Sequence, residues 1–312
     1  MAGPTLLDII KAQVADPQVG LIDETTRAHP EITMAAARPI RGVSYKTMVR
    51  TALGNPQGGS FRAANQGSTP IVHRYENREV ECFILEPRFQ CDRAVADAHP
   101  DGPQFYIAQQ NEGTLEGEFQ GISKVFYYGR DATFGNASAF PGLLSAYDAI
   151  NMVVDAAGTT DNVCSSVWAV KFGVQYVQWL MGMNGGFNFS PLRIESITDP
   201  ADSTKRFDGY VQTLLARPGL QVGTTQCIGR IKKLTTDAGK GLTDALISKL
   251  LALFKVGMVP DVLFMTRRSR QQLQASRTAT NPTGQPAPIP TEAFGVPIAV
   301  TESLSDIETL TL

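Results

Sequence analysis

The sequence predicts an α+β fold, and three observations lead to that prediction. Several segments of the 312-residue chain alternate apolar and polar side chains with the two-residue period of a β-strand. One stretch, residues 102–128, carries instead the 3.6-residue apolar period of a helix. Near the C-terminus a helix–strand–helix unit stands among segments with the pattern of antiparallel strands, a combination typical of mixed α+β domains.

The composition excludes several classes of protein. Hydrophobic residues make up 43% of the chain and charged residues 19%, so the chain has enough apolar side chains for a core and is not disordered. It has 28 basic and 30 acidic residues, a net charge of −2, which excludes a nucleic-acid binder that acts through a strongly basic surface. The charged fraction is below the roughly 25% usual in soluble domains, which indicates that much of the surface contacts other protein.

The cysteine, secretion and membrane signals are negative. The four cysteines form no C-x-x-C pair and have no histidine cluster nearby, so we expect reduced core thiols of a cytosolic product. Met1–Leu7 lacks the basic region of a signal peptide. The longest uncharged stretch, Phe172–Leu192, contains several amides and a proline, and its alternation predicts a buried strand that turns at 184–186. We therefore expect no transmembrane segment.

The first 45 residues predict an N-terminal arm. Leu6–Val14 is a candidate for one short amphipathic helix, and the proline and glycine residues that follow it prevent a long regular element. An arm of this kind has little core of its own, so it must pack on something else or stay loose.

The region from Tyr45 to Leu85 predicts a long β-hairpin. Tyr45–Leu53 and Arg78–Leu85 alternate like strands, and the glycine- and proline-rich segment Gly54–Tyr75 separates them. A connection of this length usually has a function or is disordered. The two strands carry too few apolar residues for a sandwich, so we expect the hairpin to project from the body.

Gly102–Tyr128 predicts one long helix. Its expected apolar face comprises Phe105, Ala108, Leu115, Phe119, Ile122 and Phe126. Three glycines, Gly113, Gly117 and Gly121, form a stripe on a separate face, although each interior glycine costs ~1 kcal/mol relative to alanine. The segment is therefore either a broken helix or a helix along which another backbone approaches closely.

The remainder of the chain alternates between strands and helices. The predicted strands are Val163–Val170, Lys171–Met183, Phe207–Leu215, Thr225–Lys233, Val259–Thr266 and Phe294–Thr301. A helix carries the leucines from 242 to 253 and ends at Gly257, and a short basic helix covers Arg267–Arg277.

No catalytic constellation is present in the sequence. The three histidines form no H-E-x-x-H, Gly239-Lys240 lacks the earlier glycine of a phosphate-binding loop, and there is no G-x-S-x-G. The acidic group Glu112, Glu116 and Glu118 predicts a solvated helix face more than a metal site. We expect no enzyme activity, no cofactor and no metal.

The order of several short sequence phrases resembles a known family. The phrases are Arg50-Thr51-Ala52-Leu53, Asn65-Gln66-Gly67 and Ala94–Ala98 around the hairpin; Val125-Phe126-Tyr127-Tyr128-Gly129 and Phe140-Pro141-Gly142-Leu143 after the helix; and Ser165-Ser166-Val167-Trp168, Arg230-Ile231, Leu263–Arg267 and Phe294–Ile298 in the later strands. In this order the chain resembles a tailed-bacteriophage major capsid protein of the Hong Kong 97-like fold.

The resemblance implies a domain map and a function. The map is an N-terminal arm (1–45), an extended loop (46–100), a spine helix and peripheral domain (101–137), an axial domain (138–293) and C-terminal strands that return to the peripheral domain (294–312). The implied function is self-assembly into hexamers and pentamers of an icosahedral head that encloses double-stranded DNA. Implied partners are further copies of the chain, portal, scaffold and decoration proteins, and packaged DNA contacted non-specifically at the inner surface, with assembly in the host cytoplasm and no membrane. The alternatives are an encapsulin-like nanocompartment shell or, in a different class, a hydrolase or binding protein.

Charge is segregated along the chain, and this segregation predicts a contact between subunits. Residues 101–160 contain two basic and seven acidic residues, a net charge of −5. In the resembled family the extended loop lies across a neighbour, so the hairpin arginines are expected to meet the acids of the long helix there. The residues concerned are Arg50, Arg62, Arg74, Arg78, Glu116 and Glu118. The alternative is that the arginines only solvate a flexible loop.

Overall fold

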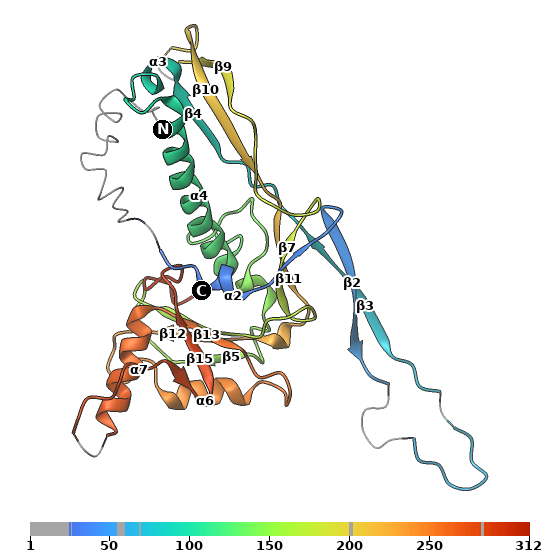
Figure 1. Ribbon diagram of the computed structural model, residues 1–312. Coiled ribbons are helices and arrows are strands. Elements are labelled where there is room, and N and C mark those ends of the chain that lie inside the picture. The colour runs from blue at the N-terminus through green and yellow to red at the C-terminus, as the bar shows by residue number, and fades with distance from the viewer. Residues whose placement is uncertain (1–24, 26, 55–59, 69, 200–201, 282–283) are drawn as a thin grey trace.

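The protein has a compact lower part and an elongated upper part, with a hairpin extending away from both (Figure 1). The structure is a computed structural model that describes residues 25, 27–54, 60–68, 70–199, 202–281 and 284–312. The candidate helix Leu6–Val14 lies outside these residues. No helix among the described residues is long and apolar enough to cross a membrane, and all four cysteines are free thiols.

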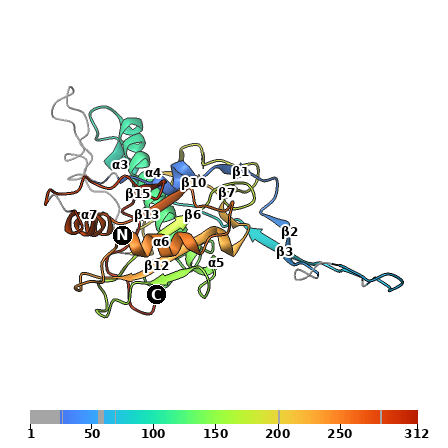
Figure 2. The ribbon, with the colours of Figure 1, turned by 90° about the horizontal axis from the view of Figure 1, so that it is seen from below.

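The hairpin consists of β2 (Ser44–Ala52) and β3 (Arg74–Glu81), paired antiparallel with Tyr45 opposite Val80. Both views show it projecting from the body, as the low apolar content of its strands predicted (Figure 1, Figure 2). The prediction of a second strand over Arg78–Leu85 was wrong by four residues. The reason is that residues 82–85 leave the hairpin, and the backbone N–H groups of Phe83 and Leu85 donate to the carbonyls of Pro218 and Ala216 in the body.

The long helix α4 (Pro103–Tyr128) is continuous, so the interpretation as a broken helix was wrong. Pro103 occupies the first turn, where its missing N–H is not needed. Gly129 follows the last turn with φ +57, a left-handed conformation that glycine adopts without a steric penalty. The predicted bounds of this helix are therefore confirmed.

The predicted apolar face of α4 is only partly correct. Ile122 and Phe126 are buried, whereas Phe105 and Ala108 are exposed. The last turn is enclosed on all sides, so Val125, Tyr127 and their neighbours are buried whatever face they occupy. The first turn contacts a different cluster, in which Tyr106 packs on Cys91 and Ala96. A single stripe cannot describe a helix whose two ends enter different cores.

The lower part is built around a six-stranded mixed sheet in the order β14-β15-β13-β6-β12-β5. Its strands are β5 (Val153–Asp155), β6 (Ser165–Val170), β12 (Ile228–Leu234), β13 (Val262–Met265), β14 (Glu292–Ala293) and β15 (Val296–Val300). Along β6, Trp168 and Val170 contribute to the cluster that receives the end of α4. The alternate residues Val167 and Ala169 pack with α6 (Asp244–Ala252) and α7 (Arg267–Ala279). The sheet is thus covered on both faces.

The C-terminal strand β15 belongs to the six-stranded sheet and also contacts the end of α4. It pairs in parallel with β13, with Leu263 opposite Ile298, and its Ala299 lies in the same buried cluster as Tyr127 of α4. The residues that follow reach the same end of the helix, where Tyr128 donates a hydrogen bond to Glu308. The assignment of residues 294–312 to the peripheral domain stays a prediction.

The upper part contains two smaller sheets beside α4 (Figure 1). One has the order β1-β7-β11, and the other centres on β10, which pairs with β4, β8 and β9. Their strands are β1 (Ala37–Pro39), β4 (Arg88–Asp92), β7 (Val177–Met181), β8 (Asn188–Phe189), β9 (Arg193–Thr198), β10 (Arg206–Leu215) and β11 (Pro218–Val222); the short helices are α2 (Pro30–Met34), α3 (Arg93–Ala96), α5 (Leu143–Ala146) and the 3-10 turn η1 (Thr225–Cys227). The described part of the arm packs on the body, because β1 pairs with β7 and Glu31 of α2 is fully buried.

Candidate assembly surface

The hairpin presents apolar side chains to solvent. Phe61 in the tip is 95% exposed and Val72 is 76% exposed, and Met48 and Tyr75 in the strands are also exposed. Scattered apolar residues are ordinary on protein surfaces, but several on one projecting ribbon with no core of its own mark a surface that contacts another molecule.

The four hairpin arginines do not share one face. Arg74, Glu76 and Arg78 occupy alternate positions of β3, so their side chains lie on the same face of the ribbon. Arg50 is paired with Tyr75, which places it on the opposite face. Arg62 belongs to the tip, where its guanidinium donates to the carbonyl of Gln66 at 2.7 Å.

The arginines also differ in how far they are already engaged. Arg78 lies 3.8 Å from Glu76 in an ion pair. Arg50 and Arg74 are exposed, and neither forms an ion pair with any residue that the structure describes. These two arginines are therefore the ones available to an external acid, one on each face of the ribbon.

Glu116 is engaged within the subunit by the N-terminal arm. Its Oε1 accepts hydrogen bonds from the backbone N–H of Arg27 at 3.2 Å and from the side chain of Gln120 at 3.2 Å. The same oxygen lies 3.1 Å from Nε2 of His29. Burial acts to raise the pKa of Glu116, but the hydrogen bonds from His29, Gln120 and Arg27 outweigh it and lower the pKa below its usual value.

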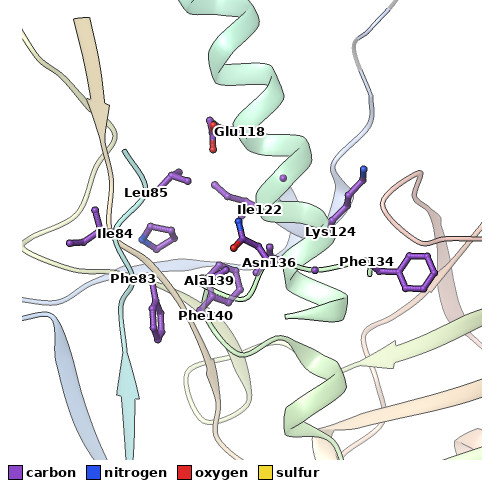
Figure 3. A pocket seen from close by; sticks show the side chains of 14 residues that line it. Phe83, Ile84, Leu85, Glu118, Ile122, Lys124, Phe134, Asn136, Ala139 and Phe140 are labelled. Atoms are coloured by element: carbon purple, nitrogen blue, oxygen red, sulfur yellow. The ribbon is translucent and has the colours of Figure 1, made fainter. Parts of the chain in front are cut away.

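Of the two helix acids predicted to contact a neighbouring subunit, Glu116 and Glu118, only Glu118 remains available. It is half-buried, and burial raises the pKa of its carboxyl group. It lines a cavity of about 220 Å³ between α4 and the root of the hairpin, together with Gly121, Ile84 and Lys124. Figure 3 shows Glu118 near the hairpin-root residues, with Ile122 one turn further along the helix. No hydrogen bond or ion pair joins Glu118 to the described residues.

The glycine stripe of α4 is exposed in the subunit. A Cβ atom added at Gly113, Gly117 or Gly121 would have no atom within 4 Å among the described residues. The expectation that another backbone approaches closely along the stripe is therefore wrong within one subunit. The stripe runs beside the cavity, because Gly121 is one of its lining residues.

A buried ion pair joins the six-stranded sheet to the C-terminal segment, and sequence reasoning missed it. Arg230 Nη2 lies 3.2 Å from Glu308 Oε2, and both side chains are 1% exposed. Ser166 donates to the same carboxylate at 2.6 Å, and Tyr128 donates to its other oxygen at 2.7 Å. The only signal in the sequence is an arginine between the apolar residues of a buried strand, and that signal does not identify the partner.

Glu31 is a second buried carboxylate, and it connects the arm to two other segments. Ser303 donates to its Oε1 at 2.8 Å, and Tyr127 donates to its Oε2 at 3.4 Å. Burial raises the pKa of Glu31, although hydrogen bonds from its own backbone and from Ser303 oppose the shift. No cation is paired with it among the described residues.

The acidic and basic groups singled out in the sequence have the following surroundings. Within the described ranges, no group of three or more histidine, cysteine, aspartate or glutamate side chains is placed to hold a metal ion. In the basic helix α7, Arg267 and Arg268 are paired with Glu302 and Asp306.

Comparison with known proteins gives a family and a fold. Residues 28–308 match the family described as major capsid protein GP7, whereas no curated protein matches the sequence. The structure is similar to one from bacteriophage Epsilon15 determined by cryo-electron microscopy, with a TM-score of 0.71 and 20% identity over 99% of this chain and 97% of that chain. It is also similar to the capsid of bacteriophage JBD30, with a TM-score of 0.52 and 11% identity over 95% of this chain and 97% of that chain.

These findings answer the question of class that the sequence left open. At such low identity the two structures establish the fold, which is the predicted Hong Kong 97-like α+β fold. The family match spans nearly the whole chain and describes a structural protein, so the alternative of a hydrolase is excluded. The chain therefore belongs to the major capsid protein GP7 family and is a capsid shell protein.

Proposed function

We propose that this chain assembles into a closed icosahedral shell of hexamers and pentamers, in which each hairpin lies across α4 of a neighbouring subunit. The observation that carries the proposal is the projecting ribbon itself, whose apolar residues Met48, Phe61 and Val72 are exposed in the single subunit. Such an element gains burial only from another molecule, and repeated identical contacts between copies generate closed shells.

The contact between hairpin and helix is centred on Arg74 and Glu118. Arg74 lies on the hairpin face that carries two arginines and one glutamate, and the region around α4 has a net charge of −5. Glu118 is favoured over Glu116, because Glu116 already binds the arm. A partly exposed pair contributes only ~0–1 kcal/mol. Many simultaneous contacts in a shell add such small contributions, and charge pairs select the register of docking more than its affinity.

The domain map follows the same proposal. The region around α4 (101–137) is the peripheral domain, and residues 138–293 with the six-stranded sheet form the axial domain around the capsomer axis. Residues 1–45 and 46–100 are the arm and the extended loop. The shell encloses double-stranded DNA, contacts it non-specifically, and assembles in the host cytoplasm with separate scaffold, portal and decoration proteins. The support for this part is the resemblance of the chain to phage capsid proteins.

The test of assembly is electron microscopy of the purified full chain in negative stain, with and without co-expressed scaffold. Shells or capsomer rings of uniform size are expected. A monodisperse small oligomer under every assembly condition would contradict the proposed shell.

The test of the docking contact is charge reversal with a matched control. Arg74→Glu alone and Glu118→Arg alone should each reduce shell yield, and the double variant should recover part of it. Arg50→Glu is the matched control, because Arg50 is an exposed arginine without an ion pair on the other face of the same ribbon. Equal effects of the two arginine reversals, or no effect of either on yield and its salt dependence, would reject this contact and leave the capsid assignment intact.

A further inference from the structure

The carboxyl group of Glu31 is enclosed at a junction of three segments of the chain. Glu31 belongs to the short helix α2, which lies beside the lower end of α4 (Figure 1), and the residue is 0% exposed. Ser303 of the C-terminal segment donates to one carboxyl oxygen at 2.8 Å, and Tyr127 of α4 donates to the other at 3.4 Å. The described part of the arm is therefore tied to α4 and to the C-terminal segment through this one group.

The side chains that bond this carboxyl group carry hydroxyl groups. Besides Ser303 and Tyr127, they are Ser123 of α4 and Thr301. A hydroxyl group both donates and accepts hydrogen bonds, so it can bond a neutral carboxylic acid as well as a carboxylate. No lysine or arginine among the described residues pairs with Glu31. Since a buried carboxylate without a cation is costly, this site favours the neutral acid.

The charged side chains around α2 are paired with one another and not with Glu31. The pairs are His29–Glu116 (3.1 Å), Arg27–Glu302 (3.8 Å) and, behind Tyr127, Arg230–Glu308 (3.2 Å). Of these residues, His29 also contacts the Glu31 site, because its Nδ1 lies 3.2 Å from Oγ of Ser123. Protonation of His29 is therefore the effect that an experiment on Glu31 must separate.

We propose that Glu31 is a pH-sensitive latch for the arm, which holds α2 on α4 and residues 301–303 while its carboxyl group is neutral and releases α2 when that group ionises. Ionisation places an unpaired negative charge in an enclosed site, and departure of α2 brings the charge into water. The latch concerns the position of the arm within one subunit and does not depend on how subunits assemble.

The direction of the pH dependence follows from the burial of the acid. Burial raises the pKa of Glu31 when α2 is docked, so docking is strongest at low pH. It weakens as the pH rises from the ordinary range of a glutamate to the raised pKa. Release of α2 sets free one proton in this range, so the docking equilibrium constant should fall about tenfold for each pH unit.

Trp179 reports on the position of α2. Its indole Nε1 donates to the backbone carbonyl of Glu31 at 3.1 Å, and the residue is 4% exposed. The chain has two tryptophans, and the other, Trp168, is fully buried in β6. As the pH rises, the fluorescence of the unassembled full chain should shift to longer wavelength while its far-ultraviolet circular dichroism stays constant. Trp179→Phe should not show the shift.

Two arm variants assign the shift to one group. Glu31→Gln is uncharged and nearly the same size, so it should keep α2 docked and abolish the pH-dependent shift. His29→Gln is the matched control two residues away, and it should retain the shift. The proposal is overturned if the wild-type emission does not respond to pH while the subunit stays folded, if Glu31→Gln responds as the wild type does, or if His29→Gln abolishes the response.

Hydrogen exchange provides a second measurement that needs no substitution. The backbone N–H groups of Ile32 and Thr33 donate to the carbonyl of His29 within α2. After correction for the intrinsic pH dependence of exchange, their protection should fall about tenfold for each pH unit and stay below that of helix α6. Protection that is independent of pH, or equal to that of α6, would overturn the latch. Both experiments use unassembled subunits, so their failure would leave the proposed shell assembly intact.

Discussion

Replacing the stripe glycines of α4 by alanine should stabilise the isolated subunit. Gly117 is in the interior of a 26-residue helix, and an added Cβ would meet no atom within 4 Å. Alanine is favoured over glycine in a helix interior by ~1 kcal/mol, because glycine loses more backbone entropy on folding. Since nothing in the subunit opposes the new methyl group, Gly117→Ala should add about that amount to the free energy of unfolding.

The triple variant at Gly113, Gly117 and Gly121 should add about 2–3 kcal/mol if the three sites act independently. Urea unfolding of the unassembled subunit measures this quantity. Gly129→Ala is the contrasting control, because Gly129 has φ +57 and its added Cβ would collide with the backbone of Gly142. That variant should be destabilised. A loss of stability in the stripe variants would show that the exposed, unstrained helix of this structure is incorrect.

Assembly of the same variants separates two explanations of the stripe. If a neighbouring backbone packs against these glycines in the shell, three methyl groups prevent the close approach and shell yield falls although the subunit is more stable. If the stripe faces solvent in the shell as well, yield stays unchanged or rises. An exposed run of three glycines would then have no explanation in packing.

Three further outcomes follow from the buried groups and the arm. Glu308→Gln should reduce the free energy of unfolding, measured by urea titration, by about 3–5 kcal/mol, because it leaves buried Arg230 without its counter-charge. Replacing both residues by apolar ones should recover much of this loss. Burial raises the pKa of Glu31 above its usual value, so the unfolded chain releases this proton at a lower pH than the folded chain. The free energy of unfolding of the wild-type subunit should therefore fall, relative to that of Glu31→Gln, as the pH rises to the raised pKa. A relative gain in the unfolding midpoint with rising pH would contradict this reasoning. Deletion of residues 2–28 should leave a folded subunit by circular dichroism but reduce shell yield, and global unfolding would instead assign the arm to the core.

Local periodicity was sufficient to predict the elements that make most of their own contacts. The bounds of α4 follow from a proline in its first turn and a glycine after its last, and α7 begins where predicted at Arg267. The alternation of β10 predicted Phe207–Leu215, and the observed strand is Arg206–Leu215. In each case the signal is contained within one segment, so a single sequence carries it.

The features that could not be predicted depend on residues far apart in the chain. Residues 82–85 look like a continuation of the hairpin strand, and only their pairing with the segment around Pro218 explains why the hairpin ends at Glu81. Ser303 and Glu31 are 272 positions apart, and their hydrogen bond is visible only once α4 has brought the arm and the C-terminus together. For the same reason the charge count selected Glu116 and Glu118 equally, whereas the structure shows that the arm engages Glu116.

The way the hairpin is attached bears on how such weak contacts can organise a shell. A two-stranded ribbon alone is marginally stable in water, but here its root is held by the Tyr45–Gln221 hydrogen bond and by the backbone pairing of Phe83 and Leu85 with the body. An element that is already ordered loses less conformational entropy on docking than one that folds on its partner. Small contributions such as that of the proposed Arg74–Glu118 pair are then not lost to the entropy cost of ordering the ribbon. They can determine which of its two faces meets the neighbouring helix, which is the difference that the Arg74 and Arg50 reversals measure.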